Sequence, residues 1–418
     1  MSRLDELIQE LCPDGVEYMP LWSVTIWDKK FNAVDRAKQP EVMNYNYFLA
    51  SELFALEVEN GDVFLLSTGE QTGWTTKELA GKNLHEGEVV TIPWGKSRSV
   101  TDCIKYYKGK FVTADNRIMT SNNTDKLNNK YLYYWIMTQG KLIDTFYRGS
   151  GIKHPDMAKV LDMQIPVPPL EVQREIVRIL DNFTELTAEL TAELTARKKQ
   201  YEYYRDMLLT FDARGEAISD VVWRTLGEVC NLQSGKAISA YLISDTQTVE
   251  NSIPCYGANG LRGYVSTSNE SGDKPIVGRQ GALCGNVCFA TGSYYATEHA
   301  VVVTDKGFFN SRFLYHLLVN ADLNQYKTAG AQPGLSVARL NEVKVPVPTR
   351  TVQDRIANVL DNFDAICSDL NIGLPAEIAA RQKQYEYYRD ALLTYAATGK
   401  IILDRQTDRQ TDRQTSNN

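Results

Sequence analysis

Apolar residues recur every three or four positions in two long stretches of the chain, at about residues 165–216 and 345–400. This is the spacing of one face of an α-helix. Alternating steps of three and four are also typical of a coiled-coil seam. The first stripe includes Val172, Ile176, Phe183, Leu186, Leu190, Leu194, Tyr201, Tyr204 and Leu208, and the second includes Val352, Ile356, Phe363, Leu370, Tyr385, Tyr388 and Leu392. We therefore expect two long amphipathic helices.

The two predicted helices are copies of each other. The run Leu180–Phe183 returns as Leu360–Phe363, and Lys199–Asp206 recurs unchanged as Lys383–Asp390. An offset of about 180 residues is too long for a solenoid, whose units run roughly 20 to 50 residues. The duplication therefore indicates two whole modules and approximate internal two-fold symmetry.

The copies differ in one place. The first contains a repeated tetrad, Thr187–Leu190 and Thr191–Leu194, which adds a leucine to the stripe, as a four-residue insertion in a coiled coil does. The second is about four residues longer and contains Gly373-Leu374-Pro375. Glycine is typical of a helix end and proline of a first helical turn. We expect the first helix to run straight and the second to be kinked or interrupted.

Two other stretches are rich in glycine, β-branched and aromatic residues. Short apolar runs bounded by turn residues predict strands at Val89–Pro93, Phe111–Ala114, Lys274–Gly278 and Ala300–Thr304. Each stretch ends in a segment without helix breakers, 131–136 or 308–318, which favours a helix. An extended Pro-x-Pro segment then leads into each long helix. The predicted fold class is α+β, with two β-rich domains separated by two long helices.

The predicted layout is as follows: residues 1–15 form an N-terminal helical segment, 16–164 the first β-rich domain, 165–216 the first long helix, 217–344 the second β-rich domain, 345–400 the second long helix and 401–418 a disordered repeat tail. A helix of ~40 residues spans ~60 Å. If the two seams bury each other, the helices are antiparallel and hold the domains at opposite ends, related by a pseudo-two-fold axis. Duplex DNA is a natural partner for such a body.

Composition excludes several classes of protein. No apolar stretch approaches the ~20 residues of a membrane helix, and the start lacks a signal-peptide pattern, so we expect no membrane contact and a cytoplasmic location. The seven cysteines are scattered, and Cys284 with Cys288 lacks a second ligand pair, which favours buried thiols over zinc. The net charge of −7 gives no whole-chain basic footprint, so DNA contact requires local positive charge.

No catalytic motif is visible in the sequence. It contains no Walker lysine loop, no H-E-x-x-H, no G-x-S-x-G and no Asn- or Asp-Pro-Pro-aromatic tetrad of the kind found in adenine methyltransferases. The four histidines are dispersed along the chain. We therefore expect a non-catalytic chain with no cofactor and no metal.

This layout resembles the specificity subunits of type I restriction–modification systems. The duplicated helical segments, the tetrads and the Pro-x-Pro segments after two divergent domains carry the resemblance, which covers nearly the whole chain. It implies that each divergent domain is a target-recognition domain for one half of a split double-stranded DNA site. It also implies that the helices set the spacer and bind two methyltransferase subunits, and that restriction subunits join the complex.

Two other functions stay open, namely a DNA-independent coiled-coil scaffold and an enzyme whose nuclease or methyltransferase site is not recognisable. A length-tolerant linker is the alternative to a spacer-setting helix.

The tail repeats the unit Asp404–Thr407. A four-nucleotide repeat read through three frames could encode this unit, so we hypothesise a slippage tract that varies the end of the reading frame.

Local charge marks a candidate DNA-contacting segment in the first domain. Residues 91–120 carry Lys96, Arg98, Lys105, Lys108, Lys110 and Arg117 against Asp102 and Asp115. The turn Trp94-Gly95-Lys96-Ser97-Arg98 joins an aromatic ring to two cations, which suits phosphate contacts and guanine recognition by Arg98. A solvated surface hairpin is the alternative.

Glycine-flanked polar side chains are the candidates in the second domain. Arg262, Arg279 and Gln280 lie between glycines that permit close backbone approach, and Arg or Gln can address guanine or adenine edges. Lys153 and Gln332 lie in equivalent glycine-rich segments before the two Pro-x-Pro segments, so we expect both to face DNA from related positions. Structural turns are the alternative.

Tyrosines cluster in the second half of each long helix, at Tyr201, Tyr203, Tyr204, Tyr385, Tyr387 and Tyr388. Tyr201 and Tyr204 share the apolar face with Leu208, so core packing is favoured over base stacking. Tyr203 and Tyr387 are then left for a partner subunit.

Overall fold

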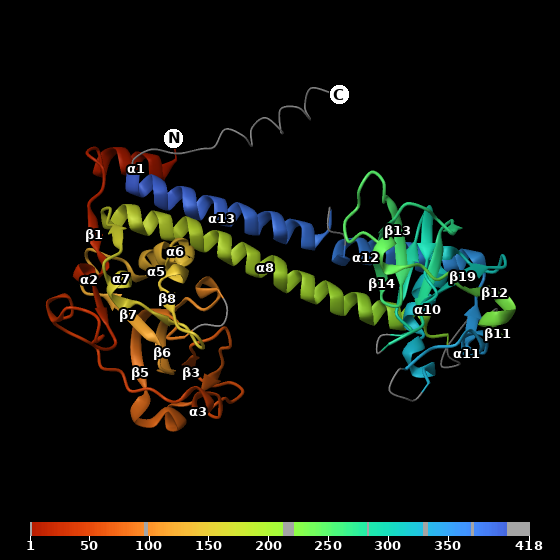
Figure 1. Cartoon of the computed structure of the whole chain (residues 1–418), viewed down its shortest axis with the longest axis horizontal. Helices are drawn as coiled ribbons and strands as arrows, with labels where there is room; N and C mark the ends of the chain where they lie inside the picture. The colour runs from red at the N-terminus through yellow and green to blue at the C-terminus, as the bar shows by residue number, and fades with distance from the viewer. Residues whose placement is uncertain are drawn as a thin grey trace. The chain divides into compact units, whose positions relative to one another are not determined.

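The computed structural model describes residues 2–95, 99–211, 221–281, 284–328, 333–368 and 372–398. The chain divides into two compact units (Figure 1). Unit 1 comprises Met1–Ala188 and Ala380–Asn418, and unit 2 comprises Glu189–Ala379. The long helix α8, Leu170–Leu209, begins in unit 1 and ends in unit 2 as one uninterrupted helix of 40 residues. Each unit therefore draws its helices from two distant parts of the chain.

Unit 1 is built on a six-stranded sheet. The strand order is β2 (Thr25–Trp27), β7 (Arg117–Ser121), β5 (His85–Ile92), β6 (Lys105–Thr113), β3 (Val63–Leu66) and β4 (Trp74–Thr75). The pairs are antiparallel except β3 with β6, which is parallel. The runs predicted as strands at 89–93 and 111–114 lie largely in β5 and β6.

Helix α5 (Asn129–Thr138) packs the sheet of unit 1 against the long helices. Its Tyr131, Leu132 and Ile136 are fully buried in one core with Val172, Ile176 and Leu180 of α8. The N-terminal helix α1 (Arg3–Leu11) and Leu393 of α13 (Leu374–Thr398) complete this core. The short helices α2 (Leu21–Val24), α6 (Gly140–Thr145) and α7 (Met157–Leu161) add residues to this core, whereas α3 (Ala50–Phe54) and α4 (Lys77–Ala80) contribute to a separate cluster with β3.

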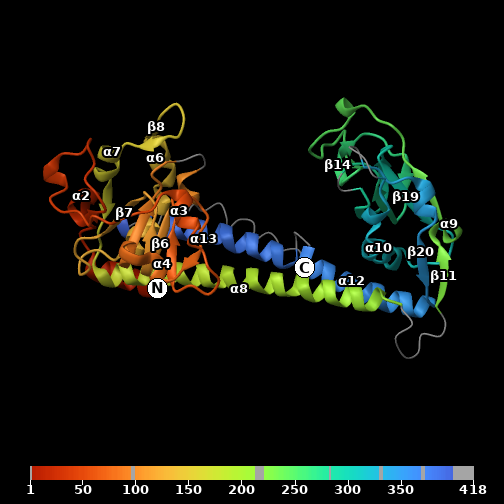
Figure 2. The same ribbon diagram turned by 90° about the horizontal axis from the view of Figure 1, so that it is seen from below.

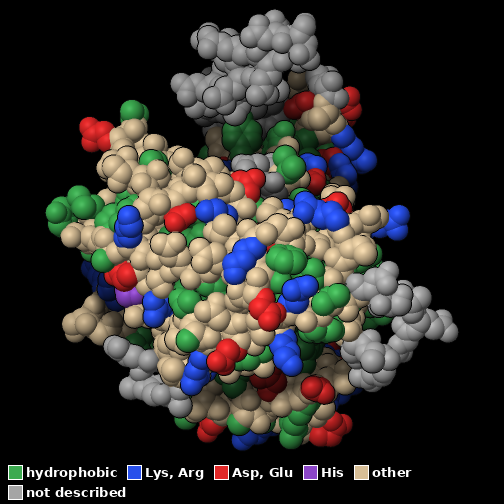
Figure 3. Space-filling model, turned by 90° about the vertical axis from the view of Figure 1, so that its right-hand side faces the viewer, with side chains coloured by type: hydrophobic (Ala, Val, Ile, Leu, Met, Phe, Trp, Pro, Cys, Tyr) green, Lys and Arg blue, Asp and Glu red, His purple; other side chains and the backbone are tan. Residues whose placement is uncertain are grey.

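Unit 2 contains two four-stranded sheets. The first has the order β12 (Cys230–Ser234), β19 (Ala300–Asp305), β16 (Lys274–Gly278) and β17 (Val287–Ala290), and the second has the order β14 (Gly260–Val265), β13 (Ile253–Gly257), β18 (Ser293–Ala296) and β15 (Glu270–Ser271). The strands predicted at 274–278 and 300–304 are confirmed. The face of unit 2 in Figure 3 carries acidic and basic side chains interspersed, so no single sign of charge dominates it.

The predicted helix at 308–318 begins later than expected. Helix α10 spans Ser311–Asn320, because the Asn310 side chain accepts hydrogen bonds from the amides of Arg312 and Phe313 and so caps the helix. In unit 1, Asn128 caps α5 in the same way through Lys130 and Tyr131. The two units therefore start corresponding helices with the same capping residue.

Each Pro-x-Pro segment begins as a strand. In unit 1, β10 (Gln164–Pro166) pairs antiparallel with β1 (Tyr18–Pro20). In unit 2, β20 (Lys344–Val347) pairs in the same way with β11 (Val222–Thr225). In unit 2, α9 (Leu226–Val229) follows β11 as α2 follows β1, and α11 (Val337–Asn341) precedes β20 as α7 precedes β10. Each pair closes its unit just before the long helix begins.

A buried glutamine fastens each long helix to its unit. Gln173 is fully buried, and its Nε2 donates to the carbonyls of Lys126 and Pro168, both at 2.7 Å. Its Oε1 accepts from the Asn128 amide at 2.8 Å. In unit 2, Gln353 makes the same three contacts with Phe308, Pro348 and Asn310. We call this arrangement of the glutamine and its three backbone partners the glutamine clamp.

The predicted seam contains matching aromatic stacks. In unit 1, Phe183 of α8 stacks on Tyr388 of α13 with ring centroids 5.4 Å apart. In unit 2, Tyr204 of α8 stacks on Phe363 of α12 (Arg350–Ser368) at 5.6 Å. Leu186, Leu190 and Leu194 are half-buried, whereas Glu189 and Glu193 are exposed, as the tetrad pattern predicts.

The predicted interruption of the second helix is confirmed. Helix α12 ends at Ser368 and α13 begins at Leu374, with Ile372 and Gly373 outside both helices. The Gly373 carbonyl accepts from the amides of Ala376 and Glu377, so α13 restarts at this glycine. Leu370 lies outside the described residues.

We predict that Gln173→Leu destabilises the protein by about 3 kcal/mol or more, because it leaves an amide and two carbonyls without partners at a cost of about 1–3 kcal/mol each. Urea unfolding of the full chain measures this loss. The same substitution at the exposed Gln382, whose side chain contacts Glu386, is the control and should leave the transition nearly unchanged. Equal effects of the two substitutions would contradict a clamp.

Candidate nucleic-acid interface

Two loops that the sequence predicts separately as candidate DNA contacts lie against each other in unit 1. The loop after β5 contains Trp94, whose ring lies 4.1 Å from that of His154, between centroids. The Nδ1 atom of His154 lies 3.1 Å from the Trp94 carbonyl oxygen. A Cβ atom on Gly95 would approach the Ile152 side chain to 2.5 Å, so a larger residue there would require the exposed Ile152 side chain to move. Lys153 is exposed beside it, whereas Lys96, Ser97 and Arg98 lie outside the described residues.

These loops lie on the side of unit 1 away from the long helix. The hairpin of β8 (Tyr147–Arg148) and β9 (His154–Pro155) lies well apart from α8 (Figure 2). The Tyr147 hydroxyl donates to the Pro93 carbonyl, which ties the hairpin to the end of β5. The hairpin and the end of β5 are therefore held together at a distance from α8.

Unit 2 brings the corresponding segments together. The loop after β16 carries Arg279 and Gln280, and Gln280 forms an isolated antiparallel bridge with Gly334. The Leu335 amide donates to the Arg279 carbonyl at 2.9 Å, and the Gly281 amide to the Pro333 carbonyl at 3.0 Å. In both units, therefore, the loop after a central strand contacts the segment that leads to the next short helix. Gln332 lies outside the described residues.

A hollow of about 500 Å³ adjoins the loop pair of unit 1. It is lined by Lys29, Lys30, Phe31, Asn32, Ala33, Arg117, Arg148, His154, Pro155, Asp156 and Met157. We call it the cationic hollow, because four of these residues are Lys or Arg and one is a carboxylate. Sequence reasoning singled out neither Lys29 and Lys30 nor Arg148, since these residues lie far apart in the chain and form no local run.

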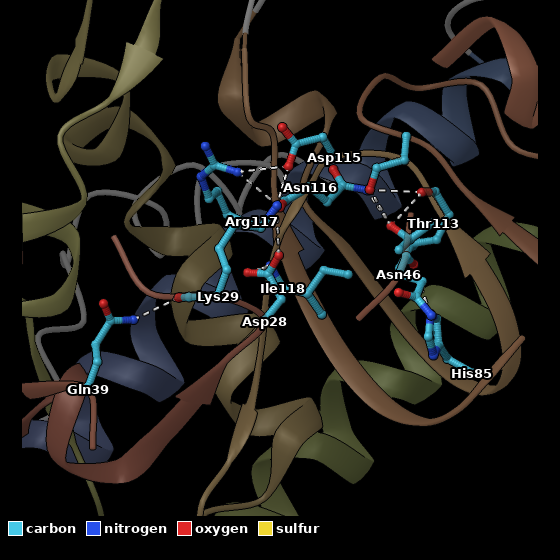
Figure 4. Close-up of polar contacts among 12 residues, drawn as sticks. Asp28, Lys29, Gln39, Asn46, His85, Thr113, Asp115, Asn116, Arg117 and Ile118 are labelled. Carbon is cyan, nitrogen blue, oxygen red and sulfur yellow. Dashed lines mark hydrogen bonds and ion pairs between the residues drawn. The ribbon is translucent and has the colours of Figure 1, made fainter. Parts of the chain in front are cut away.

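Lys29 and Arg117, which line the cationic hollow, belong to one ion network (Figure 4). The Lys29 ammonium lies 3.4 Å from a carboxylate oxygen of Asp28 and also contacts Asp115. Nη1 of Arg117 donates to Asp115 at 3.2 Å and to the Asn116 carbonyl at 3.3 Å. Nε of Arg117 is buried and has no hydrogen-bond partner within the described part of the chain.

The side chain of Gln39 holds the loop that follows Lys29 (Figure 4). Its Nε2 donates to the Lys29 carbonyl at 3.0 Å, and its Oε1 accepts from the Phe31 amide at 2.8 Å. Because Gln39 is buried, this loop is fixed on one side of the hollow. Lys30 is exposed on it.

The Asp28 carboxyl group is buried away from water. Burial raises the pKa of its carboxyl from 3.8 to about 6, although Lys29, the Ile118 amide and Arg117 act in the opposite direction. The Ile118 amide donates to Asp28 Oδ1 at 3.2 Å. The carboxyl therefore titrates in a mildly acidic range.

Two cations of the basic segment at 91–120 have partners within unit 1. Lys105, a predicted DNA contact, donates its ammonium to the Ser67 carbonyl at 2.9 Å, to the Ser67 hydroxyl at 2.8 Å and to the Gly69 carbonyl. Burial lowers the pKa of Lys105 to about 8. Lys105 is therefore better placed to hold the 67–71 loop than to contact phosphate. Lys108 lies 3.5 Å from Glu88 on the neighbouring strand.

The second domain gathers polar atoms that lack partners. Nη1 of Arg279 donates to the Ser234 hydroxyl at 2.8 Å. Within the described residues, buried atoms of four neighbouring side chains have no hydrogen-bond partner, namely Arg279 Nε, Thr297 Oγ1, Glu298 Oε2 and His299 Nδ1. Such atoms are rare in folded proteins and mark a place where a polar ligand or water can bind. Arg262 is exposed on β14, in the other sheet of the unit.

The described residues contain no group of three or more His, Cys, Asp or Glu that could hold a metal ion. The seven cysteines among these residues are not joined in disulfide bonds. No helix in the described part of the chain is long and apolar enough to cross a membrane. The site chemistry that remains is a set of cations, aromatic rings and amides, which suits recognition of phosphate and base edges.

Comparison with known proteins gives the family. The model of the type I restriction modification DNA specificity domain matches the chain twice, at residues 43–197 and 218–380. The chain belongs to this family. It is 34% identical to the EcoR124I/EcoR124II type I restriction enzyme specificity subunit of Escherichia coli, over 94% of this chain and 97% of that protein.

One further relative and one solved structure are also similar to the chain. The chain is 42% identical to the EcoprrI type I restriction enzyme specificity subunit of Escherichia coli, over 59% of this chain and 63% of that protein, so this match spans less than two thirds of the relative. The crystal structure of the type I restriction-modification S subunit from M. genitalium matches with a TM-score of 0.60 at 18% identity, over 91% of this chain and 96% of that one. This structural match shows that the family fold is shared.

We predict that Asp28→Asn removes a pH dependence of stability. The raised pKa means that the folded protein holds the Asp28 proton more tightly than the unfolded chain, so wild type loses up to about 3 kcal/mol of stability as the pH rises from about 4 to about 6. The stability of Asp28→Asn relative to wild type should therefore rise over this range.

Urea unfolding at a series of pH values measures this difference. Asparagine keeps an oxygen that accepts from the Ile118 amide, so the variant should fold. Asn at the exposed Asp14 is the control. A wild-type-to-variant difference that stays constant with pH would show that the Asp28 proton is not coupled to folding.

Proposed function

We propose that this chain is the DNA sequence-specificity subunit of a type I restriction–modification complex, in which each recognition domain reads one half of a bipartite site. The observation that carries the proposal is the double match of the family model, with one copy on the first divergent domain and its helix and one on the second. The glutamine clamp repeats in both units, whereas their sheets differ. A constant framework with different sheets suits two different half-site sequences.

We assign base reading to the paired loops and assign the domains the bounds 16–164 and 217–344. In the first domain, the candidates are Trp94, Lys96, Ser97, Arg98 and Lys153. In the second, they are Arg262, Arg279, Gln280 and Gln332. Support comes from the contact of Trp94 with His154 and from the bridge between Gln280 and Gly334, which hold these loops in related positions.

We propose that the long helices bind two methyltransferase subunits, and that restriction subunits join this complex. Tyr203 is 65% exposed and Tyr387 40% exposed, at equivalent positions of the duplicated segment. Two equivalent exposed aromatics suit two copies of one partner, because aromatic residues are enriched at interface hot spots.

We assign the chain no catalytic step of its own. His316 resembles a catalytic histidine, because its Nε2 lies 2.7 Å from Asp361 and its Nδ1 lies 3.4 Å from the Tyr201 hydroxyl. It is fully buried, however, and in unit 1 Tyr134 takes its place by donating to Asp181 at 2.6 Å. A packing role explains both observations.

Methylation mapping in cells that carry this chain and its modification subunit tests the function. The expected result is methylated adenines in one split motif, which returns both half-sites and the spacer. Salt-sensitive, site-selective binding to duplex DNA excludes a DNA-independent scaffold. Methyl transfer or DNA cleavage by the isolated chain would overturn the non-catalytic assignment.

We predict that deletion of Thr191–Leu194 changes the spacer between the half-sites and keeps their sequences. Removing four residues shortens α8 by ~6 Å and rotates its ends by ~40°. The spacer should therefore shift by one or two base pairs, as read by methylation mapping. Thr191→Ala, which keeps the length, is the control. An unchanged spacer in the deletion variant would favour a length-tolerant linker.

We predict that Tyr203→Ala and Tyr387→Ala each weaken binding of one methyltransferase subunit by roughly tenfold, which corresponds to about 1.4 kcal/mol for one aromatic contact. Titration calorimetry with the purified methyltransferase should give one weakened and one unchanged site for each single variant. Tyr241→Ala, at a tyrosine that is 84% exposed in the second domain, is the matched control. Two unchanged sites in the single variants would remove these tyrosines from the interface.

A further inference from the structure

We infer that the cationic hollow of unit 1 is an anchor for a backbone phosphate of duplex DNA, formed by Lys30, Arg148 and His154. This inference rests on the proposed function, and it adds to it a site that fixes the position of the DNA without reading its sequence. Phosphate contacts set register and orientation, whereas base-edge contacts give specificity.

The charges of the cationic hollow are not equally available. The Lys29 ammonium contacts the carboxylates of Asp28 and Asp115, which largely neutralise its charge, and it also stands 4.6 Å from the centre of the Tyr47 ring. Arg117 is held by Asp115 and lies over the Phe31 ring at 5.4 Å. The other two cations of the hollow have weaker contacts with carboxylates or lie open to solvent. Lys30 is exposed, and the Arg148 side chain is 66% exposed and reaches Asp156 only at 4.0 Å.

Arg117 and the ion network give the hollow a fixed wall. The Arg117 side chain is 13% exposed, and both hydrogen bonds that its guanidinium donates within the described residues come from Nη1. Because Arg117 lines the hollow and is held in one position, its charge makes a fixed positive contribution there, which favours an anion.

His154 connects the cationic hollow to the predicted base-reading loop. Its ring packs against Trp94, and its Nδ1 lies at hydrogen-bond distance from the Trp94 carbonyl. His154 also lines the hollow. A phosphate bound there would therefore sit next to the loop after β5, where its contacts can position that loop on the DNA.

Two other hollows of unit 1 lack this excess of charge. One, of about 410 Å³, is lined by Glu70 and by no Lys or Arg. The other, of about 470 Å³, is lined by Lys38, Lys126 and Glu41, and Lys38 is paired with Asp162. The cationic hollow is thus the one of these three whose lining favours an anion.

The test is DNA binding by the full chain assembled with its methyltransferase subunits, measured over a series of salt concentrations. The probes are a duplex with the mapped split site and a scrambled duplex of equal length. For Lys30→Gln combined with Arg148→Gln, we expect weaker binding to both duplexes by the same factor. The slope of log affinity against log salt should fall by about 1 for each phosphate that the protein no longer neutralises. Lys82→Gln, at an exposed lysine outside the hollow, is the control and should match wild type.

The outcomes separate the two levels of the proposal. A wild-type salt slope in the double variant overturns the phosphate anchor and leaves the proposed function intact. Loss of preference between the two duplexes also overturns it, because the hollow would then read bases. If the wild-type complex itself shows no preference for the mapped site, the proposed function fails. An unchanged thermal unfolding curve shows that the variant is folded.

Discussion

The buried amide of Gln173, and its counterpart Gln353, is the contact on which the arrangement of each unit depends. One side chain joins the start of a long helix, the last proline of the Pro-x-Pro segment before it and the cap of the helix that supports the sheet. All three partners are backbone groups, so the hydrogen bonds do not depend on the side chains of those three residues. The hydrogen bonds are buried, where an unpaired polar group is most costly. Recognition loops can therefore diverge while their support stays constant.

A second polar contact shows how far the framework can vary. Asp181 takes Lys130 and Tyr134 as partners in unit 1, whereas Asp361 takes Arg312 and His316 in unit 2. Each aspartate thus accepts from one cation and one ring-bearing residue at the same places in the fold. Burial lowers the pKa of His316, although its contact with Asp361 acts in the opposite direction. The position and hydrogen-bonding capacity are kept, and the residue type is not.

The long helices could be predicted from the sequence because their signal is local and periodic. The stacks of Phe183 on Tyr388 and of Tyr204 on Phe363 follow from the apolar stripe. The restart of α13 at Gly373 follows from glycine and proline chemistry. The candidate site was much less predictable. Lys105 looks like a free cation in a basic segment, but the Ser67–Gly69 loop binds its ammonium. The cationic hollow brings residues near 30, 117, 148 and 154 together. These residues are distant in the sequence and meet because of the order of the strands in the sheet, which no local sequence pattern predicts.

The repeated clamp also bears on how such a chain can change. In both units the glutamine clamp consists of one glutamine amide and three equivalent backbone groups. A recognition domain moved from one module to the other would therefore meet the same set of hydrogen-bonding groups on the long helix. Exchange of one module between related chains would then alter one half of the target site and leave the glutamine clamp unchanged. The target sequence can therefore vary without any change in the long helices that support the recognition domains.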